Sequence, residues 1–242
     1  MFPKLVLSLS ICLFFLTNCQ IKPKGKHLFI LSGQSNMARL DPANTFTPAI
    51  AAALGSENIL VVKIAQGGQA IKRWYRDWQL PDRNPAPIQN PKSDLYDSLM
   101  TKVNQAILEE EIASVTFIWM QGERDAKQAW GDVYEESLLG LYRQVCEDLN
   151  RNDINFVIGR LSDFDLQNNR YPHWTRIREI QVKVAESAPN FAWVNTDDLN
   201  DGLNQRGEEI KNDLHLSEEG YALLGERFAK AAIELIQTSN KN

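Results

Sequence analysis

Short, nearly continuous apolar runs alternate with longer amphipathic stretches along this chain, and that alternation constrains the fold more than any other feature. The apolar runs lie at residues 27–33, 59–65, 114–120, 154–161 and 191–195. Runs of this length and composition are typical of strands in a parallel sheet that is covered on both faces. We therefore predict a mostly parallel, five-stranded sheet.

The segments between these runs have the periodicity of amphipathic helices. From residue 94 to 111, apolar side chains recur every four positions and form one stripe. Similar stripes occupy residues 133–149, residues 171–188 and the last helix, which starts at Ser217, a candidate N-cap. Strands that alternate with helices predict an α/β fold, a flavodoxin-like three-layer α/β/α sandwich with right-handed crossovers.

The N-terminal segment differs in kind from the rest of the chain. It carries one cation, Lys4, followed by "LVLSLSICLFFL", which is too short to span a bilayer and is typical of a signal sequence. "LTNC" at residues 16–19 resembles a bacterial lipobox, in which the Cys receives the lipid. We predict a signal peptide at 1–19, a lipid on Cys19 and a single domain over 20–242. The expected location is the bacterial cell envelope; simple secretion and a retained membrane anchor are the alternatives.

Composition excludes several classes of function. The formal net charge is −5 and no stripe of Lys and Arg is present, so no nucleic-acid partner is expected. Beyond the signal segment the only Cys is Cys146, which excludes a disulfide framework within the chain. The sequence has three His and lacks both Cys–His zinc spacing and HExxH, so we expect no metal and no cofactor. Membrane contact is expected only through the N-terminal lipid.

Polar clusters follow three successive predicted strands. They read GQSN at 33–36, QGG at 66–68 and QGERD at 121–125. Ligands of open α/β sheets bind outside the carboxyl ends of the strands, where parallel strands would bring these clusters to one edge. The three clusters together predict a functional site at that edge.

The residue types in these clusters fit acyl transfer. A Ser hydroxyl such as that of Ser35 is a weak nucleophile until a neighbouring base takes its proton. The charge that develops on the attacked carbonyl needs preorganised hydrogen-bond donors. The backbone N–H of Ser35, that of Gly67 or Gly68, and the side-chain amide of Gln121 are the candidates for this oxyanion hole, since a glycine backbone can approach a ligand closely.

The base should be one of the three His residues. His27 precedes the first strand and therefore lies at the opposite end of the sheet from Ser35. His173 stands at a helix start, where a surface or capping role is the simpler interpretation. His215 lies in a loop before the last helix, two residues after Asp213, and a carboxylate beside an imidazole fixes its tautomer. We predict His215 as the base.

Four blocks of the sequence carry a resemblance to a known family: "GQSNM", "GGQAIKRW", "WMQGERDA" and "DLHLSEEGYALLGERFA". In this order they resemble the SGNH/GDSL hydrolases, and more narrowly the branch of sialate O-acetylesterases and carbohydrate esterase family six. The resemblance covers nearly all of residues 20–242. It implies Ser35 as nucleophile, His215 as general base and acid, and Gln121 in the oxyanion hole where many relatives carry Asn. The lipase-type G-x-S-x-G elbow is absent, because Met37 stands where the second Gly would be.

The carboxylate that orients His215 remains open between two residues. The Asp that this family usually carries three residues before its His falls on Asn212, whereas Asp213 stands two residues before His215. Glu123 is a possible orienting carboxylate in this branch. We favour Asp213 over Glu123. Asp125 either supports the site from behind or caps a helix.

Substrate contacts are expected from side chains beside the strand ends, namely Gln34, Asn36 and Trp74. An aromatic ring near the second strand can stack on a sugar or can simply pack a loop, and the Pro-rich segment at 76–94 is expected to form an ordered rim loop. Arg73 and Arg76 could pair with an anionic sugar or could be solvated.

These features predict a serine esterase that removes O-acetyl groups from carbohydrate through an acetyl-serine intermediate. A broader esterase for short acyl chains is one alternative. A non-catalytic surface lipoprotein of the same fold, which binds carbohydrate without cleaving it, is another.

Overall fold

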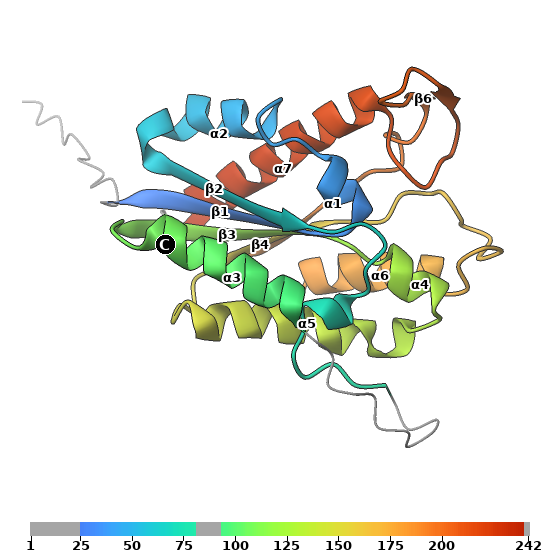
Figure 1. Ribbon diagram of the computed structural model, residues 1–242, viewed down its shortest axis with the longest axis horizontal. Coiled ribbons are helices and arrows are strands. Elements are labelled where there is room, and N and C mark those ends of the chain that lie inside the picture. Colours follow the sequence, from blue (N-terminus) through green and yellow to red (C-terminus); the bar gives the residue numbers. More distant parts are fainter. Residues whose placement is uncertain (1–24, 81–92, 240–242) are drawn as a thin grey trace, which may run out of the picture.

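A single parallel sheet forms the centre of the protein, whose computed structural model describes residues 25–80 and 93–239 (Figure 1). In spatial order the strands are β2 (Ile59–Ala65), β1 (Lys26–Gly33), β3 (Ile112–Met120), β4 (Asn155–Gly159) and β5 (Phe191–Val194). All five predicted strands are present, and every pairing among them is parallel.

Helices cover both faces of this sheet (Figure 1). On one face lie α2 (Phe46–Leu54) and α7 (Glu218–Ser239), and on the other lie α3 (Asp94–Ile107), α5 (Gly131–Asp148) and α6 (Trp174–Ala185). Each face has its own hydrophobic cluster, because side chains of a strand alternate between the two faces. The predicted three-layer α/β/α sandwich is confirmed.

The last helix begins where the sequence predicted. Ser217 Oγ accepts a hydrogen bond from the backbone N–H of Gly220 at 3.0 Å, which satisfies one of the free donors at the start of α7. A stripe of apolar residues on this helix packs into the cluster on its face of the sheet.

Several short elements were not predicted. They are α1 (Ser35–Arg39), α4 (Glu123–Lys127), the 3₁₀ turns η1 (Ser56–Asn58) and η2 (Ile71–Arg73), and a hairpin of β6 (Gly202–Leu203) with β7 (Glu209–Ile210). The helix α2 was also missed, because it buries only two side chains, Phe46 and Ile50, and two positions do not establish a period.

The order of the strands determines where along the edge of the sheet a functional site can form. The chain leaves β1 toward β2 on one side and returns to β3 on the other, so the order reverses between β1 and β3. Such a switch point opens a crevice at the carboxyl ends of the two strands. Gly33 ends β1 with a φ of 147°, and a Cβ there would lie only 2.0 Å from the carbonyl oxygen of Met120. A bare backbone is therefore required where the two strand ends meet.

Two predicted segments lie wholly or largely outside the described residues. The signal segment at 1–19, with Cys19, is one, and the rim loop at 76–94 is the other, since residues 81–92 are not described. Among the helices that the structure describes, none combines the length and apolar character needed to cross a bilayer.

Candidate active site

Ser35 and His215 meet at the carboxyl edge of the sheet. Ser35 is the first residue of α1, directly after β1, and His215 lies in the loop between β7 and α7. Although 180 positions separate them in sequence, Ser35 Oγ lies 3.2 Å from His215 Nε2. The structure thus brings together the predicted nucleophile and the predicted base, within hydrogen-bonding reach.

The surroundings of His215 favour its neutral form. Burial lowers the pKa of the imidazole, and the positive charge of Arg39 lowers it further, while Asp213 opposes both effects. A neutral imidazole has a free lone pair. At neutral pH it can therefore accept the proton of the Ser35 hydroxyl.

Of the candidate orienting residues, Asp213 lies nearest the imidazole. Its Oδ1 is 3.8 Å from His215 Nδ1 and accepts the backbone N–H of His215 at 2.9 Å. The first distance is too long for a hydrogen bond, so the carboxylate acts on the ring through charge. Glu123 is turned toward Asn36 instead, with its Oε1 2.9 Å from Asn36 Nδ2. Asn212 has a φ of 44° and directs its Oδ1 toward Asn200 Nδ2, 3.3 Å away.

Backbone amides of the first two clusters lie around Ser35. A Cβ on Gly67 would lie 3.5 Å from Ser35 Cβ, and Gly68, at a φ of 71°, lines the cavity beside Ser35. Within the described residues, the backbone N–H groups of Ser35, Gly67 and Gly68 donate to no protein acceptor. Arg124 Nε donates to the carbonyl oxygen of Gly68 at 2.7 Å and fixes this turn. Unused backbone donors from both clusters are therefore available beside the hydroxyl.

The side-chain amide of Gln121 was predicted to donate to the oxyanion, but its hydrogens are used elsewhere in this structure. Its side chain is fully buried, and its Nε2 contacts three acceptors: Asp125 Oδ2 at 2.5 Å, Gln69 O at 3.1 Å and Gln34 Oε1 at 3.2 Å. An amide nitrogen has two hydrogens, and both are engaged inside the protein. The spacing of the sequence located this residue correctly at the strand end, but could not show which acceptors its amide already serves.

Asp125 supports the site from behind. Its Oδ2 accepts the backbone N–H of Ile71 at 3.0 Å, besides the Gln121 amide, and so connects the second and third clusters. Complete burial raises the pKa of Asp125 to about 6, while the hydrogen bond from Gln121 opposes the shift. Of the two predicted roles, support fits these contacts.

Glu123 and Asn36 form a buried pair. Asn36 is 3% exposed, so the prediction that it contacts substrate is wrong for this structure. Its Nδ2 donates to Glu123 Oε1 at 2.9 Å and to the carbonyl oxygen of Leu214 at 3.2 Å, and its Oδ1 accepts the Tyr221 hydroxyl at 2.8 Å. Burial raises the pKa of Glu123 to about 7, and its Oε2 has no partner among the described residues.

The predicted substrate contact from Trp74 is also wrong for this structure, and neither alternative considered for Arg73 and Arg76, pairing with an anionic sugar or solvation, describes their contacts. Trp74 is fully buried and donates its Nε1 to Ser32 Oγ at 2.9 Å, so its ring packs the core and cannot stack on a sugar. Arg73 forms a two-pronged ion pair with Asp94, and Arg76 forms one with Asp148. Both guanidinium groups are already neutralised by carboxylates of the protein.

The other two histidines lie elsewhere, as predicted. His27 Nδ1 lies 2.7 Å from Ser114 Oγ, at the amino end of the sheet. His173 precedes α6, and its Nδ1 accepts the backbone N–H of Gly131 at 2.9 Å, which ties the starts of two helices together.

A small cavity of about 220 Å³ opens at Ser35 and His215. Gln34, predicted as a substrate contact, lines it, although its Oε1 accepts bonds from Gln121 and from the backbone N–H of Arg124. Four further lining residues were not predicted: Arg124, Lys127, Tyr171 and Leu214. Arg124 and Lys127 are three residues apart on α4, a spacing that places both on one helix face, but the sequence did not predict this five-residue helix. Larger surface hollows lie along α5 and α6, away from Ser35.

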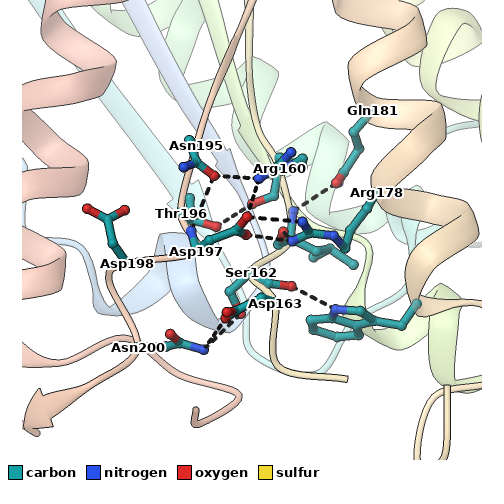
Figure 2. Close-up of polar contacts among 12 residues, drawn as sticks. Arg160, Ser162, Asp163, Arg178, Gln181, Asn195, Thr196, Asp197, Asp198 and Asn200 are labelled. Carbon is teal, nitrogen blue, oxygen red and sulfur yellow. Dashed lines mark hydrogen bonds and ion pairs between the residues drawn. The ribbon is translucent and has the colours of Figure 1, made fainter. Parts of the chain in front are cut away.

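A polar network at the ends of β4 and β5 holds the loop that leads to His215 (Figure 2). Asp197 accepts ion pairs from Arg160 at 2.6 Å and from Arg178 at 2.7 Å, which joins both strand ends to α6. Below them, the Asn200 side chain points to Ser162 and Asp163 (Figure 2).

Asn200 connects this network to the His215 loop. Its carbonyl oxygen accepts the backbone N–H of Asp213 at 3.2 Å, and its Nδ2 donates to the Asp213 carbonyl oxygen at 3.2 Å. It is 2% exposed. The sequence analysis missed Asn200, because no motif marks it.

Comparison with known proteins identifies the family and the fold. The family model described as carbohydrate esterase, sialic acid-specific acetylesterase, matches residues 38–234. Among curated protein sequences, no match was found.

Solved structures share the fold at low sequence identity. A protein from Arabidopsis thaliana is 20% identical with a TM-score of 0.63, covering 87% of this chain and 98% of its own. A carbohydrate acetylesterase from Xanthomonas citri is 17% identical with a TM-score of 0.59, covering 87% of this chain and 57% of its own. A carbohydrate acetylesterase family member from Sinorhizobium meliloti is 13% identical with a TM-score of 0.52, covering 88% of this chain and 99% of its own. The predicted resemblance to SGNH-type carbohydrate esterases is confirmed at the level of the fold and the family.

Proposed function

The chain belongs to the sialic acid-specific acetylesterase family of carbohydrate esterases, and from this premise we propose that it removes O-acetyl groups from carbohydrate through an acetyl-Ser35 intermediate. The observation that carries the serine mechanism is the 3.2 Å distance between Ser35 Oγ and His215 Nε2. A hydroxyl beside a neutral imidazole is the arrangement that nucleophilic acyl transfer requires.

In the first half of the reaction, Ser35 Oγ attacks the acetyl carbonyl carbon while His215 Nε2 takes the hydroxyl proton. The carbonyl oxygen becomes an oxyanion, which the backbone N–H of Ser35 and that of Gly67 or Gly68 stabilise. The carbon–oxygen bond to the sugar then breaks, and His215 returns the proton to the sugar oxygen. The products are a free sugar hydroxyl and acetyl-Ser35.

In the second half, a water molecule takes the place that the sugar has left. The water oxygen attacks the acetyl carbon of acetyl-Ser35 while His215 takes a proton from that water, and the same two amides stabilise the second oxyanion. When the bond to Ser35 Oγ breaks, His215 gives the proton to Ser35. Acetate leaves and the hydroxyl is restored.

The walls of the cavity favour an acidic sugar with a short acyl group. The volume of about 220 Å³ and the polar lining suit acetyl better than a long acyl chain. Arg124 and Lys127 line one side and place two positive charges there. Glu123 is the sole carboxylate among the described lining residues; it is almost fully buried and accepts a hydrogen bond from Asn36. A carboxylate on the substrate would offset this excess of positive charge.

Release of acetate by the purified protein tests this function. We expect hydrolysis of acetylated carbohydrate, with acetylated sialic acid cleaved faster than neutral acetylated xylan, and no hydrolysis by Ser35→Ala. Acetylated peptidoglycan serves as a further acidic substrate. Equal rates with acetyl and butyryl nitrophenyl esters and no preference for carbohydrate would favour a broad short-chain esterase. Binding of carbohydrate that Ser35→Ala leaves unchanged, with no acetate release by the unmodified protein, would favour a non-catalytic lipoprotein.

Substitution of Lys127 tests the recognition of an acidic group on the substrate separately from the hydrolysis step. Lys127→Gln should raise KM for the acidic substrate about tenfold, as expected for the loss of one charge-assisted contact, and leave KM for the neutral substrate unchanged. Lys127→Arg retains the charge and is the matched control. Equal effects of Lys127→Gln on both substrates would contradict recognition of an acidic group.

A further inference from the structure

We propose that Asn36 is a positioning residue, which holds His215 against Ser35 by fixing the carbonyl of Leu214. The catalytic arm of this proposal rests on the proposed function; the geometric arm does not. Asn36 directly follows Ser35 on α1, and Leu214 directly precedes His215. The hydrogen bond from Asn36 Nδ2 to Leu214 O, at 3.2 Å, therefore connects the immediate neighbours of the two reacting groups.

Two neighbours determine the orientation of the Asn36 amide. The carbonyl oxygen of Leu214 lies 3.2 Å from Asn36 Nδ2, and a carbonyl oxygen can only accept a hydrogen bond. The Tyr221 hydroxyl, 2.8 Å from Asn36 Oδ1, donates to the opposite end of the amide. With the Oδ1 end occupied by a donor, the nitrogen must face Glu123 and Leu214.

The side-chain chemistry of Asn36 fits this position closely. Nδ2 donates one hydrogen to Glu123 Oε1 and the other to Leu214 O, so the amide has no hydrogen left to donate to a substrate. At 3% exposure the side chain does not reach the substrate in any case. Asn36 thus acts on the reaction only through the placement of His215.

The backbone before His215 has to be held in place, because the His215 side chain makes few other hydrogen bonds that would fix its ring. Its Nδ1 is 3.8 Å from the nearest carboxylate oxygen, beyond hydrogen-bonding distance, so charge alone does not fix the ring. Asn200 Nδ2 contacts the carbonyl oxygen of Asp213, the residue directly before Leu214. The two consecutive carbonyls before His215 are therefore each contacted by a buried Asn side chain.

An exchange of donor and acceptor tests the proposal. Asn36→Asp alone faces Glu123 with a second carboxylate and should destabilise the protein. Combining Asn36→Asp with Glu123→Gln restores one amide and one carboxylate with their positions exchanged, so the mutual hydrogen bond returns. The carboxylate at position 36 still cannot donate to Leu214 O. We expect the double variant to melt within about 4 °C of the wild type, with kcat lowered about 100-fold and KM changed less than about threefold.

A spectroscopic readout follows the Ser35–His215 contact without catalysis. The sequence has three His, so the ring signals of His215 can be assigned by NMR with a His215→Gln variant. Because Ser35 Oγ touches Nε2, Ser35→Ala should shift the His215 signal in the wild-type background. In the double variant, measured well below its melting temperature, Ser35→Ala should no longer shift it.

Asn190→Asp is the matched control. Asn190 Nδ2 donates to the carbonyl oxygen of Ile154 at 2.7 Å, at the far edge of the sheet, so the same chemical change removes a comparable bond there. It should lower the melting temperature and leave kcat and the His215 signal unchanged. If the double variant does not fold, Asn36→Ala removes the same contact without adding charge and should also abolish the shift.

The outcomes separate this proposal from the proposed function. A folded double variant with wild-type kcat, or one in which Ser35→Ala still shifts the His215 signal, overturns the positioning role. Recovery of stability together with recovery of kcat would mean that the Asn36–Glu123 pair only stabilises the fold. A wild-type protein that releases no acetate would refute the esterase proposal, while the NMR arm would still decide the role of Asn36.

Discussion

At the scale of single residues, the site depends on how the protein sets protonation states near Ser35. The imidazole of His215 is kept neutral by burial and by Arg39, while two carboxyl groups behind the site, Glu123 and Asp125, are kept partly protonated by burial. Each of these effects has a sign that an experiment can check.

Arg39 should set the acid limit of activity. Its positive charge disfavours the imidazolium form of His215, so Arg39→Gln should raise the pKa of His215 and move the acid limb of the kcat/KM profile to higher pH. Activity should fall near pH 6 and stay unchanged near pH 8. Arg39→Lys retains the charge and should behave as the wild type. An acid limb that does not move in Arg39→Gln would show that Arg39 has no influence on His215.

Glu123 should make stability depend on pH. Its folded pKa of about 7 lies above the ordinary value of 4.5, so the folded state holds a proton that the unfolded state loses in this range. The contribution of Glu123 to stability is therefore complete below about pH 4.5 and declines as pH rises toward 7. Glu123→Gln removes this decline, so its melting temperature relative to wild type should be higher at pH 8 than at pH 5. The opposite trend would contradict a protonated Glu123.

The sequence predicted which residues lie close together better than it predicted which hydrogen bonds their side chains form. Ser35 and His215 could be predicted because a polar group at a strand end and an Asp–His pair before a helix have chemical meaning wherever they occur. The amides of Gln121 and Asn36 could not be assigned in this way, because several of their acceptors come from distant segments, such as Gln34 for Gln121 and Leu214 for Asn36. Burial of Trp74 depends likewise on tertiary packing.

At the scale of elements, the close approach of β1 and β3 at their carboxyl ends determines where Ser35 stands. Gly33 has no side chain to separate its backbone from Met120, and α1 starts two residues later. The five strands could be predicted because their apolar runs are short for helices, rich in β-branched and aromatic residues, and separated by amphipathic segments. The short helices α1 and α4 have only five residues each, so they show no period in the sequence.

Gly33→Ala tests this close approach. A Cβ there would lie 2.0 Å from Met120 O on a backbone with a φ of 147°, so we expect a loss of about 2–4 kcal/mol in the free energy of unfolding. Gly207→Ala is the matched control, since its φ is 77° and nothing lies within 4 Å of a Cβ there. It should cost about 1 kcal/mol of strain alone. Urea unfolding of both variants measures the difference; equal losses would contradict the steric argument.

At the scale of the whole molecule, the strand order converts local motifs into one site. The reversal between β1 and β3 brings the clusters after β1, β2 and β3 to a single edge, and the segment between β5 and α7, which carries His215, lies at the same edge. The sandwich could be predicted from the alternation of elements. The order of its strands could not, because the apolar runs are too similar to specify their neighbours.

Export with a lipid on Cys19 remains our proposal for the N-terminal segment. Expressed in a bacterium, the full chain should incorporate labelled palmitate and fractionate with membranes, because a diacylated Cys provides two acyl chains for anchoring. Cys19→Ser should abolish the label and release the protein from the membrane fraction. Label that persists in Cys19→Ser would show that another residue is modified.

Labelling by a serine-directed phosphonate tests the central claim most directly, since it reports the reactivity of Ser35 before any substrate is known. Mass spectrometry of the folded wild-type protein should find the phosphonate on Ser35 alone, and His215→Asn should slow the labelling about 100-fold or more. Labelling would be absent in Ser35→Ala. A folded wild-type protein that is not labelled at Ser35, or that is labelled equally fast without His215, would contradict a nucleophilic Ser35 activated by His215.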